Sequence, residues 1–289
     1  MSLGVAEKLK VSPKIKSIKV TEDNNIAVTW SKVPGAEKYA VKRTSDLSGE
    51  FEHLTWVKKC EFIDETAEKD TVYWYRITAW KKLDGKKTST KNSGIKAGVV
   101  SEIEAPSVVF ARAEKKPAIA LKWKKISGTD GCVVGRRNDF FSQIVPIAAV
   151  EGEAFTDEGI VTGQPYHYSL QYYKKDGDRL LYGNFSREVH CIHLDCGRVL
   201  SAKALHGKRA EISLRLVAGA DGYIIERSEE KDGEFTEVGR TKGGLDLHFY
   251  DKLPKAFRTY YYRTVAFRNV CDSEFRSQPS KTVSIKSKI

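Results

Sequence analysis

One pattern of residues occurs three times in this chain, at intervals of 91 to 93 positions. Residues 26–30 read IAVTW, and the same alternation of apolar residues returns as IALKW at 119–123 and EISLR at 211–215. Such alternation is typical of a strand with one buried face. Nine positions after Trp30, Trp123 and Leu214 stand Tyr39, Cys132 and Tyr223. A pattern that recurs with matching internal spacing indicates three copies of one folding unit.

The second half of each copy carries a shared set of acidic and aromatic residues. A Phe-x-Asp triplet ends at Asp64, Asp157 and Asp251, and a Tyr-x-Tyr pair begins nine residues after each Asp. The pairs are Tyr73 and Tyr75, Tyr166 and Tyr168, and Tyr260 and Tyr262. A glycine marks a chain reversal at one place in each copy, at Gly35, Gly128 and Gly219.

Strand signals with turns roughly every 8–12 residues, and no helical periodicity, predict an all-β sandwich in each copy. We expect Trp30 and Trp123 to fill cores between two sheets, and the first tyrosine of each pair to bond nearby backbone as a tyrosine corner. These residues resemble fibronectin type III domains, and the resemblance covers nearly the whole chain. It implies three tandem immunoglobulin-like β-sandwiches at 1–103, 104–195 and 196–289. Cys132 and Leu214 depart from the family's tyrosine and tryptophan, but both are apolar and suit a core.

Lysine-rich hairpins refine this resemblance. The segments KKLDGKK at 81–87 and KKDGDR at 174–179 place Gly after Asp for a tight turn. In this the chain is similar to the Lys- and Tyr-rich repeats of secreted and surface proteins of Gram-positive bacteria. The resemblance implies a bacterial protein that is extracellular or on the cell surface, although residues 1–5 do not read as a signal peptide. The short links at 101–106 and 193–198 restrict hinge motion, which suits a spacer.

Composition argues against several kinds of partner. Of the 289 residues 40% are hydrophobic and 30% charged, and no apolar run approaches the roughly 20 residues that cross a bilayer. The net charge is +11, but lysines and acids are interspersed rather than gathered on the single stripe typical of nucleic-acid binding. We therefore predict no membrane insertion and no nucleic-acid partner. We expect a monomer whose partner is a protein, a cell-wall polymer or another glycan.

No arrangement of residues points to catalysis. None of the six histidines lies in a nucleophile or metalloprotease motif. Asp64, Asp157 and Asp251 recur at a strand-end turn, so we interpret them as turn caps rather than acid–base pairs. Residues 190–196 read HCIHLDC, and Cys191, His193 and Cys196 are possible zinc ligands. Structural zinc sites usually pair two ligand clips and only one is visible, so we predict no metal, no cofactor and no enzyme. A Cys191–Cys196 disulfide is a further alternative for an exported protein.

The outward face of the strand that carries each Tyr-x-Tyr pair is the candidate binding surface. If the tyrosines point inward, the residues that alternate with them point outward. From this outward set we select as candidate binding residues Trp74, Arg76, Trp80, Tyr173, Tyr261 and Arg263. Exposed rings of this kind anchor protein partners or stack on sugars. Alternatively, arginines or lysine stems cover the rings and the face has no partner. Trp56, Phe140 and Phe141 also read as exposed.

These observations favour one hypothesis and leave one alternative. The leading hypothesis is a non-enzymatic extracellular module of tandem fibronectin type III domains that spaces or displays a neighbouring domain, or adheres to a protein partner. The alternative is a carbohydrate-binding module that uses the outward aromatic residues of the Tyr-x-Tyr strand. Because sandwiches of this kind host many unrelated roles, the site has to decide between them.

Overall fold

The computed structural model describes residues 9–83, 85–138 and 143–288, so Phe140 and Phe141 lie outside the described residues. Every regular element in these ranges is a β-strand, and no helix there is long and apolar enough to span a membrane. The strands form six sheets that pair into three sandwiches. The prediction of an all-β chain of three consecutive sandwiches is confirmed.

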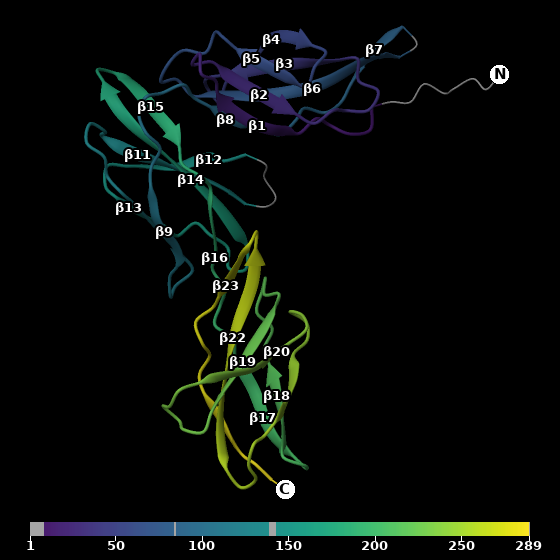
Figure 1. The fold of residues 1–289 in the computed structure, drawn as a ribbon, viewed down its shortest axis with the longest axis vertical. Helices are drawn as coiled ribbons and strands as arrows, with labels where there is room; N and C mark the ends of the chain where they lie inside the picture. Colours follow the sequence, from purple (N-terminus) through teal and green to yellow (C-terminus); the bar gives the residue numbers. More distant parts are fainter. Residues whose placement is uncertain (1–8, 84, 139–142, 289) are drawn as a thin grey trace, which may run out of the picture. The chain divides into compact units, whose positions relative to one another are not determined.

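The first sandwich pairs a three-stranded sheet with a five-stranded sheet (Figure 1). The smaller sheet, in the order β1-β2-β5, contains β1 (Ile15–Val20), β2 (Ile26–Trp30) and β5 (Glu61–Asp64). The larger sheet has the order β4-β3-β6-β7, with β8 also paired to β6. Its strands are β3 (Lys38–Thr44), β4 (Glu52–Val57), β6 (Tyr73–Leu83), β7 (Lys86–Ser89) and β8 (Lys96–Gly98).

The second sandwich repeats this strand order. Its smaller sheet is β13-β10-β9, with β9 (Val108–Ala113), β10 (Ile119–Trp123) and β13 (Ala154–Asp157). The larger sheet is β12-β11-β14-β15, and β16 also pairs with β14. Its strands are β11 (Gly131–Asn138), β12 (Val145–Val150), β14 (Pro165–Asp176), β15 (Arg179–Phe185) and β16 (Val189–Ile192).

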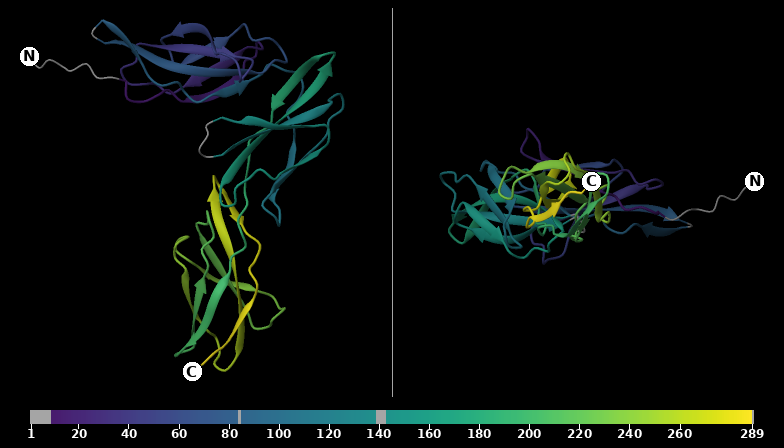
Figure 2. Two further views of the ribbon diagram at one scale, coloured as in Figure 1. Left: turned by 180° about the vertical axis from the view of Figure 1, so that it is seen from behind. Right: turned by 90° about the horizontal axis from the view of Figure 1, so that it is seen from below.

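The third sandwich has the same plan again. Its smaller sheet is β17-β18-β21, with β17 (Val199–Leu205), β18 (Arg209–Leu214) and β21 (His248–Lys252). The larger sheet is β20-β19-β22-β23, and β24 also pairs with β22. Its strands are β19 (Gly222–Ser228), β20 (Thr236–Arg240), β22 (Thr259–Val270), β23 (Ser273–Arg276) and β24 (Val283–Lys286). The left view of Figure 2 shows this sandwich from behind, with β24 running toward the end opposite the β22–β23 turn.

Contacts between residues group the chain into two compact units. One unit comprises Met1–Val108, Trp123–Glu153 and Tyr168–Glu188. The other comprises Val109–Lys122, Ala154–His167 and Val189–Ile289. The first unit therefore holds the whole first sandwich, the second unit holds the whole third sandwich, and the strands of the middle sandwich are divided between them. The domain limits at 103 and 195 stay a prediction.

Alternation along the strands places the repeated residues in the cores, as the sequence predicts. In β2 the side chains of Ile26, Val28 and Trp30 are at most 2% exposed. The tryptophan ring meets Tyr39 edge-on, with ring centroids 5.6 Å apart. In the third sandwich Leu214 takes the position of the tryptophan and is equally buried. Burial of such side chains is the main favourable term in folding each sandwich.

The first tyrosine of each pair makes the backbone contact expected of a tyrosine corner. The Tyr73 hydroxyl accepts the Glu68 backbone N–H at 3.4 Å. Tyr166 and Tyr260 accept the backbone N–H groups of Val161 and Lys255 at 2.8 and 2.9 Å. In all three copies the bonded residue lies five positions before the tyrosine, so the bond fixes the loop that enters the long strand. This prediction is confirmed.

The repeated glycines occupy turns that favour glycine for a conformational reason. Gly35, Gly128 and Gly219 have φ angles of 77°, 81° and 76°, in the left-handed region. A residue with a Cβ is strained there, whereas glycine is not. Glycine recurs in the sequence because all three sandwiches share this backbone turn.

The middle sandwich exchanges two side chains between neighbouring strands. In the first sandwich Tyr39 on β3 pairs with Ala79 on β6, and its hydroxyl accepts the Val33 backbone N–H at 2.9 Å. The third sandwich has the same pairing, Tyr223 opposite Ala266. In the middle copy Cys132 takes the tyrosine position on β11, while β14 carries Tyr172 where the other copies have alanine. The Tyr172 hydroxyl donates to the Lys124 carbonyl. The bulk lost on one strand is restored on its neighbour, which preserves core volume.

This exchange predicts a measurable coupling in the first sandwich. Tyr39→Cys leaves a cavity and should lower the free energy of unfolding by about 3 kcal/mol. Ala79→Tyr overfills the core and should cost about 1–3 kcal/mol. In the double variant the new ring fills the cavity, so the combined loss should be smaller than the sum by at least ~1 kcal/mol. Urea unfolding followed by tryptophan fluorescence measures all three values, because Trp30 contacts Tyr39.

The matched control combines Ala79→Tyr with Tyr223→Cys, whose position lies in another sandwich. Those two effects should add, because the residues share no contacts. Far-UV circular dichroism measures this control, because residues 196–289 contain no tryptophan. Equal additivity in both double variants would show that the two side chains do not exchange in the way the middle sandwich indicates.

Candidate functional site

The outward face of β6 in the first sandwich carries two tryptophans that lie in different surroundings. Trp74 and Trp80 are six residues apart on one strand, a separation of about 20 Å. Trp74 lines a hollow of about 690 Å³ together with residues such as Ile147, Leu180 and Tyr182. Trp80 lines a separate hollow of about 370 Å³ on the same sheet. The structure therefore does not bring these two rings into one binding surface.

The smaller hollow is built around a pair of tryptophan rings. Trp56 on β4 meets Trp80 edge-on, with centroids 5.1 Å apart and an interplanar angle of 86°. Between these strands runs β3, where Ala40 pairs with Trp56 and Lys38 pairs with Trp80. The Lys38 Nζ lies 4.0 Å from the centroid of the Trp56 ring, a cation–π contact. Trp56 is nevertheless 40% exposed.

We call this surface the Trp56–Trp80 hollow. Its lining is formed by β3, β4, β6, the end of β7 and the segment after β7, and consists of Ala40, Lys42, His53, Trp56, Thr78, Trp80, Ser89, Thr90, Lys91 and Asn92. Among these described residues none is acidic, and two carry a positive charge. Lys38 adds a third positive charge directly over one ring. The hollow therefore offers an exposed aromatic side chain within a positive potential.

A β-bulge explains why His53 and Trp56 share this face. The pairing of β3 with β4 shifts by one residue between Val41 and Lys42, so Leu54 has no partner opposite it. His53 and Trp56, three positions apart, then both point outward, and their rings lie 5.0 Å apart. Strict alternation would place them on opposite faces. The sequence identified Trp56 only as an exposed residue and missed His53 and the lysines, because no residue in β4 marks the bulge.

Arginines in the first and third sandwiches cover aromatic rings of neighbouring segments in the same sandwich. The Arg76 guanidinium lies 3.9 Å above the Phe51 ring, and Arg263 lies 4.3 Å above Phe235. Arg263 also pairs with Glu226 at 2.5 Å. Tyr261 is half-buried beside it on β22. These contacts correspond to the alternative in which arginines cover exposed rings, so this part of the predicted surface already has partners within the chain.

The middle sandwich does not present the exposed face that the sequence predicts. Tyr173 is 5% exposed, and the other outward positions of β14 (His167, Ser169 and Gln171) are also buried. The Tyr173 phenol lies against the backbone of Gly131, where a Cβ would come within 2.4 Å of the hydroxyl oxygen. Expecting Tyr173 to be an exposed binding residue was therefore wrong. Periodicity identifies which residues share a face but not what covers that face.

The cysteine–histidine segment 190–196 is distributed over different environments. Cys191 is 1% exposed, and burial raises the pKa of its thiol to about 11. His193 is buried, with Nδ1 3.0 Å from the Thr162 hydroxyl. Cys196 is exposed, and all five cysteines are free, so the Cys191–Cys196 disulfide is absent. Within the described ranges, the His, Cys and acidic side chains that lie close enough to share a metal are His167, His190 and Cys271 instead.

The repeated aspartates are structural, as the turn-cap interpretation predicts. Asp64 is 1% exposed and accepts hydrogen bonds from the Thr66 backbone N–H at 3.0 Å and from the Tyr75 hydroxyl at 2.7 Å. Its other strong contact is an ion pair with Arg43, also at 2.7 Å. Asp251 makes the equivalent pair with Arg227 and accepts from the Tyr262 hydroxyl, both at 2.6 Å. These carboxylates hold a turn and a core tyrosine in place.

The environment of Asp64 lowers the pKa of its carboxyl group. Burial by itself raises that pKa, but hydrogen bonds from Tyr75, Thr66 and Arg43 outweigh it. The same contacts act in reverse on the phenol: burial and the neighbouring Asp64 carboxylate raise the pKa of Tyr75. Burial also lowers the pKa of Arg43, but the carboxylate more than compensates, and the net change is upward. Each partner therefore favours the charged carboxylate and a neutral phenol.

Comparison with known proteins gives structural matches alone: no protein-family model and no curated protein matches the chain. The FN1–FN3 domains of chicken CNTN1 match with 16% identity and a TM-score of 0.33, over 96% of this chain and 97% of that one. A two-domain fibronectin type III segment of chicken tenascin matches with 13% identity and a TM-score of 0.38, over 63% of this chain and 98% of that one. Both of these solved structures are of tandem fibronectin type III domains. Resemblance to Gram-positive proteins stays a prediction.

The low pKa of Asp64 predicts acid sensitivity of the first sandwich. A carboxylate whose folded pKa is depressed stabilises the fold above its unfolded pKa of about 3.9, and this stabilisation is lost as the pH falls through the folded pKa. The free energy of unfolding should therefore drop between about pH 5 and pH 2. Asp64→Asn should lose about 3 kcal/mol at pH 7, because Arg43 keeps its charge without a partner, and should show a flatter pH profile. Urea midpoints measured by tryptophan fluorescence across this range give both values.

Tyr75→Phe is the companion variant, because it removes one donor and keeps the carboxylate. In this variant the free energy of unfolding should depend on pH less steeply than in the wild type, but more steeply than in Asp64→Asn. If the stability of Asp64→Asn depended on pH as fully as that of the wild type, the acid sensitivity could not be assigned to the Asp64 carboxylate.

Proposed function

We propose that this chain is a non-catalytic extracellular module that binds an acidic protein partner through the Trp56–Trp80 hollow, and spaces or displays the region joined to it. The observation that carries the proposal is an exposed tryptophan surrounded by lysines on an open sheet face. The proposal places the module outside the cell, as a monomer, and leaves chemistry to other domains.

Two features support the spacing role: the repeated sandwich with short joining segments, and polar residues that bond within their own sandwich. The same sandwich occurs three times, and the segments that join successive copies, 101–106 and 193–198, are short. The buried ion pairs of Asp64 and Asp251 are both made with residues of their own sandwich. These carboxylates already make their contacts within the fold, whereas Trp56 in the hollow is 40% exposed and can contact a partner.

The geometry of the rings favours a protein over a sugar. A sugar chain stacks best on free, parallel ring faces, but Trp56 and Trp80 stand at 86° to each other. One face of Trp56 carries the Lys38 ammonium at 4.0 Å. A tryptophan that is partly exposed, rimmed by polar groups and held by its neighbours resembles the anchor residues that dominate protein interfaces. The carbohydrate-binding alternative therefore has weaker support from this arrangement.

The charge of the hollow indicates the chemistry of the partner. Lys38, Lys42 and Lys91 surround the rings, and the described lining contains no carboxylate to neutralise them. Residues 1–103 also carry 19 Lys and Arg against 14 Asp and Glu. Complementary charge speeds association and selects partners, so an acidic segment with an apolar or aromatic side chain is the best fit.

The proposal predicts binding of a synthetic glutamate-rich peptide that carries one tyrosine. A peptide with glutamine in place of glutamate should bind much more weakly, and affinity for the acidic peptide should fall as salt rises. Trp56→Ala should weaken binding about tenfold or more, because it removes the anchor ring. Isothermal titration calorimetry measures the affinities, and the indole N–H signals in NMR spectra report which tryptophan is perturbed.

The matched control is Tyr250→Ala, which removes an aromatic side chain that is 58% exposed on the third sandwich. It should bind the acidic peptide as the wild type does. Equal binding of the two peptides, or no loss in Trp56→Ala, would refute the proposal. Retention of the wild type on neutral polysaccharide, lost in Trp56→Ala and Trp80→Ala, would favour the carbohydrate-binding alternative instead.

A further inference from the structure

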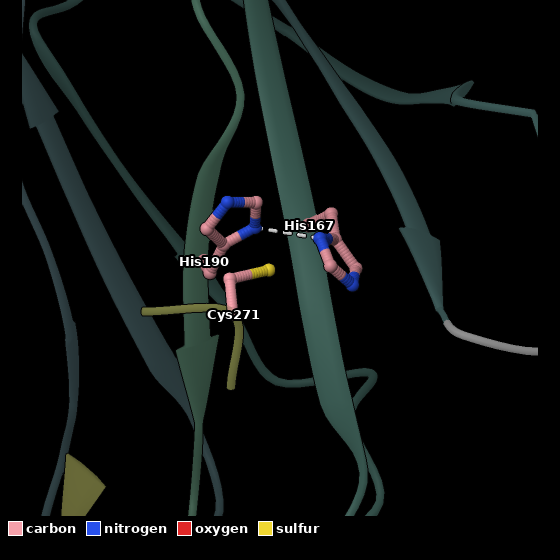
Figure 3. Close-up of side chains that lie close together, drawn as sticks. All are labelled: His167, His190 and Cys271. Atoms are coloured by element: carbon pink, nitrogen blue, oxygen red, sulfur yellow. Dashed lines mark hydrogen bonds between the residues drawn. The ribbon is translucent and has the colours of Figure 1, made fainter. Parts of the chain in front are cut away.

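Three metal-binding side chains from distant parts of the sequence converge in the second compact unit (Figure 3). His167 lies near the start of β14, His190 on the adjacent β16, and Cys271 at the turn between β22 and β23. Their nitrogen and sulfur ligand atoms all lie within 4.8 Å of one another. His167 is 4% exposed, and Cys271 is exposed, so the cluster is open to solvent on one side.

The two imidazole rings already face each other through the atoms that would hold a metal. Their Nδ1 atoms are 2.6 Å apart, and the rings stand at 77° with centroids 4.6 Å apart. A hydrogen bond at this distance requires a proton on one Nδ1 and a free lone pair on the other. Two nitrogens bound tetrahedrally to one zinc ion at about 2.0–2.1 Å are about 3.3 Å apart. A small rotation of the rings therefore opens space for an ion.

Apolar packing holds the turn that carries Cys271 beside the histidine strand. Ile192 and Leu194 pack with Val270, the residue before Cys271, and with Phe275. The chain also approaches closely at Gly163, where a Cβ would come within 2.4 Å of the Ala218 carbonyl oxygen. The position of the thiol is thus set by contacts that do not involve the cluster itself, which is the kind of support a binding site needs.

The backbone at Cys271 adds a second observation. Its φ is 52°, in the left-handed region where glycine and asparagine are favoured. A cysteine at this position keeps a thiol directed at the two imidazoles, as Figure 3 shows, despite the conformational cost.

We propose that His167, His190 and Cys271 form a zinc site. Two imidazole nitrogens and one thiolate are ligands that zinc prefers in proteins, and three protein ligands leave a fourth tetrahedral position for water. Binding deprotonates the thiol and replaces the proton shared by the two rings. The ion links β14 and β16 to the β22–β23 turn, so it fastens elements that otherwise meet through a small apolar cluster. This proposal is independent of the Trp56–Trp80 hollow.

The site differs from the one that the sequence suggested. The segment 190–196 does supply a ligand, His190, but its partners come from β14 and from a turn more than 80 residues later. Cys191 points into the core instead, and Cys196 lies outside the cluster. A ligand set assembled from three separate elements has no short sequence signature.

The test uses the 289-residue chain without a tag, kept reduced with a non-thiol reductant and freed of metal by dialysis against chelator. Titration with Zn²⁺ should show one equivalent bound, and Co²⁺ should give a thiolate-to-metal charge-transfer band. Cys271→Ser should abolish that band and weaken zinc binding by at least about tenfold, the loss seen even when residues that only support ligands are removed. The matched control, Cys196→Ser, removes an exposed thiol outside the cluster and should bind both ions as the wild type does.

Circular dichroism and thermal unfolding establish that the variants fold, and Zn²⁺ should raise the melting temperature of the wild type but not that of Cys271→Ser. If Cys271→Ser does not fold, His190→Gln tests the same site through the same titrations. Absence of stoichiometric zinc in the wild type, or wild-type affinity in Cys271→Ser, overturns the proposal. Loss of binding in Cys196→Ser alone would also overturn it, since the metal would then lie in the segment 190–196.

Discussion

A buried carboxylate that joins the two sheets is the interaction on which the first and third sandwiches depend. Asp64 lies on β5 of the smaller sheet, while its partners Tyr75 and Arg43 lie on β6 and β3 of the larger sheet. Asp251 joins β21 to β22 and β19 in the same way. Removing a partner would leave a buried group without its hydrogen bond, which costs far more than an exposed contact contributes. This explains why the aspartate and the second tyrosine keep a constant spacing in the sequence.

The tyrosine corners occur in all three copies, whereas the apolar residues of the core differ from copy to copy. The tryptophan of the first two copies is replaced by Leu214 in the third, and the ring of Tyr39 is transferred in the middle copy from one strand to its neighbour as Tyr172. Both changes keep side chains of compatible size inside the sheets. Core volume, rather than the identity of any one apolar residue, is the quantity that the three sandwiches share.

The outward faces of the larger sheets differ in exposure and charge among the three sandwiches. In the first sandwich the face is open and carries lysines around Trp56, in the third Arg263 covers Phe235, and in the middle copy the face is buried. The buried outer face of β14 also places His167 where it meets His190 and Cys271. A repeated fold thus provides one scaffold, and its solvent-facing residues differ in charge and surroundings from copy to copy.

The sequence by itself determined the class of fold, the number of sandwiches, the buried face of each long strand, the tyrosine corners and the structural role of the aspartates. These features depend on local alternation and on spacings that repeat, and a period of two or a fixed interval can be read along the chain. Only the tertiary structure decided that Tyr173 is covered, that a bulge brings His53 beside Trp56, and that Cys271 meets two histidines. Each of these depends on strand register or on contacts between residues far apart in the chain, which residue type and spacing alone do not encode.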